Sequence, residues 1–126
     1  MNTCYFFANF EPLIEKARYE IQRLEYFTNG QIIVVLTDEN KLYHVIVREL
    51  CTMCASDSDM ELIESLVEKN ESHVTRLICM CADGSLALPS FSFRKKLLAA
   101  NERNKDAEVL LCEENIFICK KLSHTF

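Results

Sequence analysis

Apolar residues recur along this chain at two spacings, and the change from one spacing to the other divides it into helices and strands. Residues Glu11–Thr28 have the three- and four-residue spacing of a helix with one buried face. That face is expected to consist of Leu13, Ile14, Ala17, Ile21, Leu24 and Phe27. Pro12 is tolerated in the first turn, and Asn29-Gly30 predicts the end of the helix. The preceding residues, Thr3–Asn9, are expected to form a short edge strand or an extended arm.

Two pairs of short apolar runs predict β-hairpins. Gln31–Thr37 and Lys41–Arg48 are rich in β-branched residues and flank a polar turn at residues 38–40. Later in the chain, Glu108–Cys112 and Ile116–Lys121 flank a second polar turn at residues 113–115. Apolar runs joined by a short polar turn are typical of antiparallel strand pairs.

The central stretch, His73–Ala100, is expected to fold as a strand, a tight turn, a short strand and a helix. Leu77–Cys81 is apolar at every position, so both faces of its first strand should be covered. Asp83-Gly84 predicts the tight turn, because glycine adopts a positive φ without steric cost.

Two further helices follow the same logic. Residues Ser58–Lys69 predict a helix whose inner stripe consists of Met60, Ile63, Leu66 and Val67. Pro89 ends the short central strand, and Ser90 or Ser92 can cap the helix that follows. That helix is expected to end at a break at residues 104–106.

The predicted order is therefore α-β-β-α-β-β-α-β-β in a single domain spanning residues 1–126. The fold class is α+β, a layered sandwich with three helices and a mainly antiparallel sheet of five to seven strands. Several strands are apolar on both faces, which favours helices on both sides of the sheet or a helix-backed sheet buried by dimerisation. The layout resembles the profilin and roadblock class of small sandwiches in architecture alone, and this resemblance implies no particular function.

Composition excludes several classes of function. The net charge of −5 argues against nucleic-acid binding, which usually needs a basic surface. The chain has neither an apolar run long enough to span a membrane nor a signal-peptide pattern, so a cytoplasmic location is expected. Its two glycines, Gly30 and Gly84, are both needed for a helix end and a turn, which leaves no phosphate-binding glycine loop. No catalytic residue and no cofactor is predicted.

Seven cysteines form an odd set, and several lie within apolar strand patterns, which favours reduced thiols over disulfides. Cys51 and Cys54 form a C-x-x-C motif that is compatible with a thiol-redox pair or half of a zinc site. Cys79 and Cys81 are the obvious second pair for zinc, because alternate residues of a strand share a face. However, structural zinc pairs usually lie on turns, so core cysteines and no bound metal are the preferred interpretation.

Three helix faces are candidate surfaces for a partner. Residues enriched at interface hot spots lie opposite the buried stripe of the first helix: Tyr19, Arg23 and Tyr26. The second helix has an acidic face of Glu61, Glu64 and Glu68, and the third a basic face of Lys95, Lys96 and Arg103. The acidic and basic faces have the charges for complementary contacts between subunits, although ordinary solvated faces explain them as well.

These features predict a small protein-interaction or adaptor domain without catalytic activity, acting as a homodimer with a protein partner of unknown identity. The first alternative is a thiol-redox or zinc-binding module that uses Cys51 and Cys54. A further alternative is a small-ligand-binding or enzymatic pocket between sheet and helix, in which Arg76 holds an anion.

Overall fold

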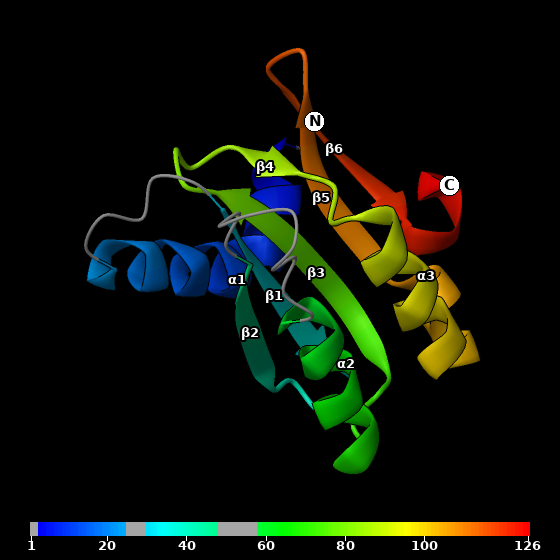
Figure 1. Cartoon of the computed structure of the whole chain (residues 1–126). Coiled ribbons are helices and arrows are strands. Elements are labelled where there is room, and N and C mark those ends of the chain that lie inside the picture. Colours follow the sequence, from blue (N-terminus) through cyan, green and yellow to red (C-terminus); the bar gives the residue numbers. More distant parts are fainter. Residues whose placement is uncertain (1–2, 25–29, 48–57) are drawn as a thin grey trace.

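The chain folds as an α+β sandwich in which one sheet separates the first helix from the other two (Figure 1). This computed structural model describes residues 3–24, 30–47 and 58–126. The helices are α1 (Thr3–Arg23), α2 (Ser58–Glu68) and α3 (Phe91–Ala100), with short 3₁₀ helices η1 (Glu102–Asp106) and η2 (Leu122–Thr125). The strands are β1 (Gln31–Thr37), β2 (Leu42–Val47), β3 (Val74–Cys81), β4 (Leu86–Ala87), β5 (Glu108–Glu113) and β6 (Ile116–Lys121).

The sheet has the strand order β2-β1-β3-β5-β6, and the short β4 pairs with β3 outside this path. Both predicted hairpins are present, because β1 pairs with β2 and β5 pairs with β6 in antiparallel fashion. The sheet is mixed rather than uniformly antiparallel, since β3 and β5 run parallel. Two strands that follow one another through β4, α3 and η1 can be parallel because this crossover is long.

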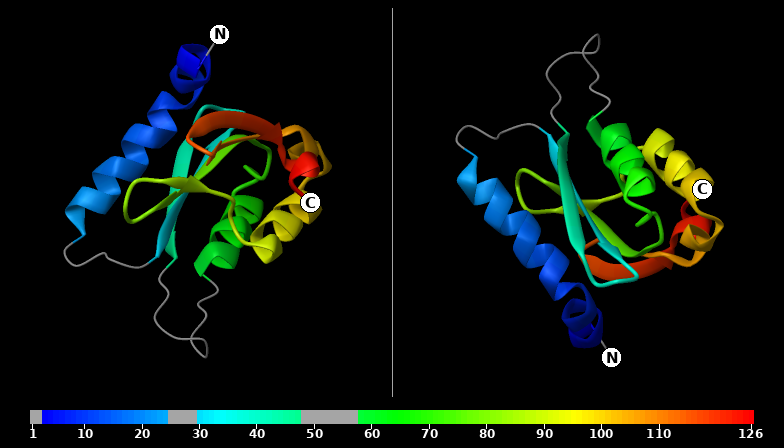
Figure 2. Two further views of the ribbon diagram at one scale, coloured as in Figure 1. Left: turned by 90° about the horizontal axis from the view of Figure 1, so that it is seen from above. Right: turned by 90° about the horizontal axis from the view of Figure 1, so that it is seen from below.

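Each face of the sheet has its own hydrophobic core. Figure 2 shows α1 on one side of the sheet and α2 and α3 on the other. Phe10, Leu13, Ile14 and Ala17 of α1 pack against one face, which includes Ile32, Val34, Ile78 and Met80. Leu62, Ile63, Leu66, Phe93 and Leu97 of α2 and α3 pack against the other, with Ile33, Val35, Leu77 and Cys79. The prediction of helices on both sides of a two-faced apolar sheet is thus confirmed.

Helix α1 differs from the prediction at its start. Thr3–Asn9 is helical, so the expected edge strand or arm is wrong, and Pro12 lies inside the helix. The apolar stripe explains this, because Phe10 is buried with Leu13 and continues the helical face to the N-terminal side of Pro12. Burial of that face outweighs the hydrogen bond that a proline nitrogen cannot make. The predicted end of this helix at residues 25–28 lies outside the described residues.

Two smaller corrections concern α2 and α3. Leu62 is buried on α2, whereas Val67, predicted for the inner stripe, is 49% exposed. Helix α3 ends at Ala100, and the residues up to Asp106 form η1 instead of continuing α3. Asn101, whose side chain accepts from the Arg103 backbone nitrogen, caps this new helix and explains the break.

Within the parts of the chain that the structure describes, no helix combines the length and apolar character required for a membrane span.

Candidate functional site

The carboxyl ends of β3 and β5 define one end of the molecule, and the N-termini of α2 and α3 lie at the same end (Figure 1). Ligands of open sheets commonly bind outside the carboxyl ends of parallel strands. Helix N-termini add unpaired N–H groups and partial positive charge, which attract electronegative ligand atoms. This end of the sheet is therefore the candidate site, and we refer to it as the helix-start end.

The start of α3 is built by Pro89, Ser90 and Phe93. The Ser90 hydroxyl accepts from the Phe93 backbone nitrogen at 3.1 Å, which is the usual hydrogen bond of a serine N-cap. The Phe93 side chain is completely buried in the core beneath α2 and α3. Consequently the first turn of α3 is held by its cap on the outside and by an aromatic ring on the inside.

Arg94 ties the C-terminal residues to this helix start. Its Nε donates to the Pro89 carbonyl at 3.0 Å, and its Nη1 donates to the Thr125 carbonyl at 2.5 Å. The Arg94 guanidinium lies 5.1 Å from the centre of the Phe126 ring, and Phe126 packs edge-on against Phe91 at 5.6 Å. Phe91 and Phe126 are both more than half exposed, so this end of the molecule carries an aromatic pair held by a cation.

Two cysteines of β3 lie at the same end of the sheet. Cys79 is fully buried, and this burial, followed by the influence of Cys81, raises its thiol pKa to about 12. Cys81 is partly exposed, and its sulfur lies 3.8 Å from the Gln31 side-chain nitrogen. Cys79 therefore behaves as an inert core residue, which agrees with the interpretation of its role as a core cysteine. Cys51 and Cys54 lie outside the described residues, so the redox and zinc alternatives that use them stay predictions.

The acidic and basic helix faces meet within one chain. Lys96 Nζ lies 3.7 Å from Glu64 Oε2, across a groove between α2 and α3. Glu68 and Val67 also line this groove, which has a volume of about 590 Å³. Complementary contacts were expected between subunits, but here at least one of these pairs is made inside the molecule. Glu61 is exposed on α2.

The remaining predicted surface residues are dispersed. Tyr19 is 58% exposed on α1, and the Arg23 guanidinium lies 5.7 Å from the centre of its ring. Tyr26 lies outside the described residues. Lys95 is 5.9 Å from the Phe91 ring, whereas Arg103 lies on η1 at the other end of α3. A role of these residues in partner binding, like the homodimer, stays a prediction.

The fold is that of the cytidine deaminases. The chain is similar to the crystal structure of a cytidine deaminase from Mycobacterium leprae, with a TM-score of 0.69 at 12% identity over 94% of this chain and 97% of that one. A cytidine deaminase from Bacillus anthracis gives 0.70 at 11% identity over 91% and 84%. One from Burkholderia pseudomallei gives 0.65 at 13% identity over 90% and 93%. No protein-family model and no curated protein sequence matches this chain. At such identities the similarity establishes the fold alone.

This finding overturns the leading functional prediction. The adaptor domain without catalytic activity is wrong as the main interpretation, because the fold that spans nearly the whole chain is one found in cytidine deaminases. It favours the alternatives that placed a metal or a small ligand in the molecule. The architectural resemblance to profilin and roadblock sandwiches is likewise replaced by the cytidine deaminase fold.

The zinc chemistry of such deaminases can be tested against the residues present. Zinc deaminases use an H-x-E motif, or a cysteine in place of its histidine, followed by P-C-x-x-C, and the histidine and cysteines bind the metal. Neither H-x-E nor C-x-E precedes Pro89 in this chain, and the proline that follows α2 introduces Pro89-Ser90-Phe91-Ser92-Phe93. Both cysteine positions are thus changed, one to the capping serine and the other to a buried ring. No group of three or more His, Cys, Asp or Glu that fits a metal occurs among the described residues. The start of α3 does not fit a zinc site.

The aromatic pair and Arg94 were missed by the sequence interpretation. Phe91 and Arg94 are three positions apart on α3, which indicates a shared helix face, but Phe126 is far away in sequence. Only the docking of η2 against α3 brings Phe126 to this position.

Proposed function

We propose that this protein binds a small nucleoside-like molecule at the helix-start end, and that it does so without a zinc ion held by α3. The match over nearly the whole chain to enzymes described as cytidine deaminases carries this proposal. A pyrimidine nucleoside is therefore the ligand class to test first. The proposal takes up the small-ligand alternative, moved from Arg76 to the opposite end of β3.

The chemistry of the helix-start end supports binding. The N-termini of α2 and α3 supply partial positive charge that suits the carbonyl and ring nitrogen of a pyrimidine. Phe91 and Phe126 present exposed aromatic surface beside the start of α3. A planar base stacks favourably on such rings, and substitution studies of other proteins give about 1–3 kcal/mol per stacked base.

The same residues argue against zinc-dependent hydrolysis at α3. A hydroxyl that accepts a backbone hydrogen bond and a buried phenyl ring replace the two thiolates of the deaminase signature. The first turn of α3, Phe91-Ser92-Phe93-Arg94, has no thiolate or carboxylate whose negative charge could balance a divalent cation.

Calorimetric titration of the full chain with cytidine tests the proposal. We expect saturable binding that is unchanged by a chelator, and no release of ammonia from cytidine in the presence of added zinc. Phe91→Ala should weaken binding about tenfold, as loss of stacking implies. Val67→Ala is the matched control, because Val67 is an exposed apolar residue near the C-terminal end of α2, away from the helix-start end.

Two results would contradict the proposal. Failure of cytidine, uridine and deoxycytidine to bind would remove the ligand class. Zinc-dependent ammonia release that is lost in Cys51→Ser would instead establish the zinc alternative and exclude a zinc-free site.

A further inference from the structure

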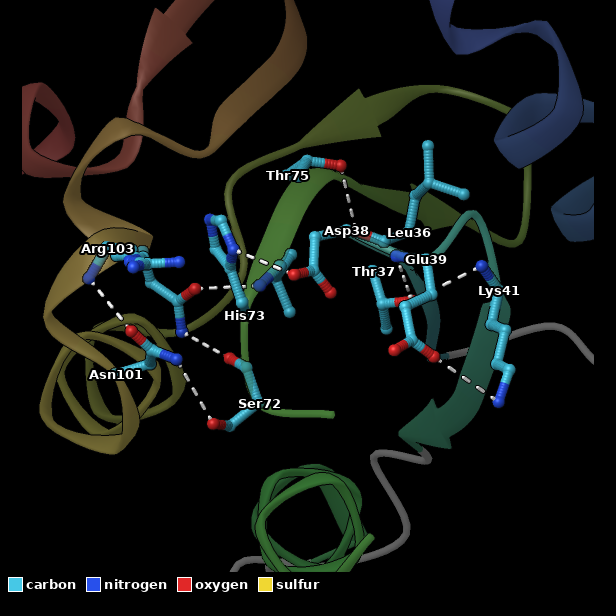
Figure 3. Close-up of polar contacts among 12 residues, drawn as sticks. Leu36, Thr37, Asp38, Glu39, Lys41, Ser72, His73, Thr75, Asn101 and Arg103 are labelled. Carbon is cyan, nitrogen blue, oxygen red and sulfur yellow. Dashed lines mark hydrogen bonds and ion pairs between the residues drawn. The ribbon is translucent and has the colours of Figure 1, made fainter. Parts of the chain in front are cut away.

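A second polar hollow lies at the end of the sheet opposite the helix-start end. It has a volume of about 280 Å³ and is formed where β3 begins, η1 turns and β6 ends. Its ionisable lining residues are His73, Arg76, Arg103, Asp106, Glu108 and Lys121. Figure 3 shows His73 and Arg103 at this end of the molecule, together with the polar residues that join η1 to the sheet.

Strand register fixes three of these charges in a row. Arg76 is paired with Glu108 across the parallel strands β3 and β5, and Glu108 is paired with Lys121 across β5 and β6. Arg76 Nε lies 3.1 Å from Glu108 Oε1, and Lys121 Nζ lies 3.5 Å from Asp106 Oδ1. Arg76 and Lys121 are thereby each held at the hollow by a carboxylate on a neighbouring element.

Positive charge nevertheless exceeds negative charge around the hollow. Three permanent cations, Arg76, Arg103 and Lys121, face two carboxylates, Asp106 and Glu108, which leaves an excess of one positive charge in a chain whose net charge is −5. Within the described part of the chain, the Arg103 side chain has no hydrogen-bond or ion-pair partner, and it is exposed at the edge of the hollow. Arginine at such a position retains all five of its N–H donors for a ligand.

We propose that this hollow binds a phosphate group, with Arg103 and Arg76 as the principal donors and Lys121 as the third cation. Arg76 engages Glu108 through Nε, and its guanidinium carbon lies 5.9 Å from the centre of the Phe10 ring. These contacts fix the group at the border of the hollow, and its two terminal nitrogens carry further N–H donors. Planar guanidinium groups match the geometry of phosphate oxygens and bind them through two parallel hydrogen bonds. The hollow is large enough for a phosphate group and part of the molecule that carries it.

The two carboxylates allow a test that distinguishes a phosphate site from ordinary solvent-exposed ion pairs. Asp106 and Glu108 compete with the anion for Lys121 and Arg76. Removal of a competing carboxylate should therefore tighten phosphate binding, whereas removal of a donor should weaken it. His73 lies 3.3 Å from Asp38 through Nδ1, so it is already engaged at the border of the hollow.

The test is calorimetric titration of the full chain with inorganic phosphate and, separately, with ribose 5-phosphate. Arg103→Gln should weaken binding by about fivefold or more, and Asp106→Asn should tighten it by a similar factor. Both residues are exposed, so neither substitution threatens the fold. Lys120→Gln is the matched control, because Lys120 is the neighbour of Lys121 on β6 and pairs with Glu113 away from the hollow.

Stronger binding of ribose 5-phosphate than of inorganic phosphate would identify a phosphate monoester, and equal binding would identify free phosphate as sufficient. No saturable binding of either at about 10 mM would overturn the proposal. Equal affinities for the original chain and Arg103→Gln, or equal effects of Arg103→Gln and Lys120→Gln, would overturn it too. The cytidine titration concerns the other end of the sheet, so the two proposals fail independently.

Discussion

At the scale of single residues, Asn104 joins three segments at the end of the sheet where β3 begins. It is completely buried, and its Oδ1 accepts from the Val74 backbone nitrogen at 2.8 Å. Its Nδ2 donates to the carbonyls of Ser72 and Leu97, each at 2.9 Å. One side chain therefore joins β3, the loop before it and α3, and each partner would lose this hydrogen bond without it.

We predict that Asn104→Ala lowers the free energy of unfolding by about 2–4 kcal/mol, because buried backbone groups lose their partners. Asn101→Ala, which removes a half-buried cap on the neighbouring helix, is the control and should cost about 1 kcal/mol. Urea unfolding monitored by circular dichroism measures both. Equal losses in the two variants would contradict the role assigned to Asn104.

The buried Cys79 thiol predicts how the free energy of unfolding depends on pH. Because burial raises its thiol pKa to about 12 from an ordinary value near 9, the folded protein keeps this proton while the unfolded chain releases it. The stabilisation is complete below pH 9 and is lost as the pH rises toward 12. The free energy of unfolding should fall by up to about 1.4 kcal/mol per pH unit in this range.

Cys79→Val, which keeps an apolar group of similar size, should lessen this slope. Urea unfolding at a series of alkaline pH values provides the measurement, with Cys112→Val as a control for a half-buried thiol on β5. A Cys79→Val protein with the same pH dependence as the original chain would show that the thiol ionises normally.

At the scale of elements, the residues at the start of α3 stabilise the fold and, for the same reason, cannot bind zinc. Ser90 caps the helix, and Phe93 fills the core three residues later. A cysteine pair at these two positions would expose thiolates to a metal, but the chain uses both positions for stability. The proposal of a zinc-free site depends on this use.

We predict that Ser90→Ala destabilises the protein by about 1 kcal/mol, since the Phe93 N–H loses its acceptor. Ser92→Ala, an exposed position in the first turn of the same helix, should change stability by less than about 0.5 kcal/mol. Thermal and urea unfolding measure the difference. A larger effect of Ser92→Ala would mean that Ser90 is not the residue that caps α3.

Sequence patterns predicted most of the helices and strands but not all of their boundaries. The run Gln31–Thr37 is apolar enough to require cover on both faces, and its place at the centre of the sheet follows from that. The sequence places Pro12 in the first turn of a helix that begins at Glu11, whereas the helix begins at Thr3 and buries Phe10 before it reaches Pro12. Val67 fits a helical stripe by spacing, but it borders the open groove between α2 and α3 and is 49% exposed.

At the scale of the whole molecule, long-range pairing decided the fold and was not visible in the sequence. The parallel contact of β3 with β5 joins residues about thirty positions apart, such as Arg76 and Glu108. No local pattern distinguishes that arrangement from a purely antiparallel sheet. The candidate site was missed for the same reason, because Phe91 and Phe126 meet only after η2 docks on α3.

The central claim is that a nucleoside-like ligand binds at the helix-start end of a cytidine deaminase fold. Nuclear magnetic resonance of the ¹⁵N-labelled chain during a cytidine titration tests it most directly. We expect the amide signals of Cys81, Ser92 and Phe93 to shift with a common saturation curve, while those of Arg76 and Arg103 stay in place. Shifts confined to the Arg76 end, or no shifts at saturating cytidine, would contradict the claim.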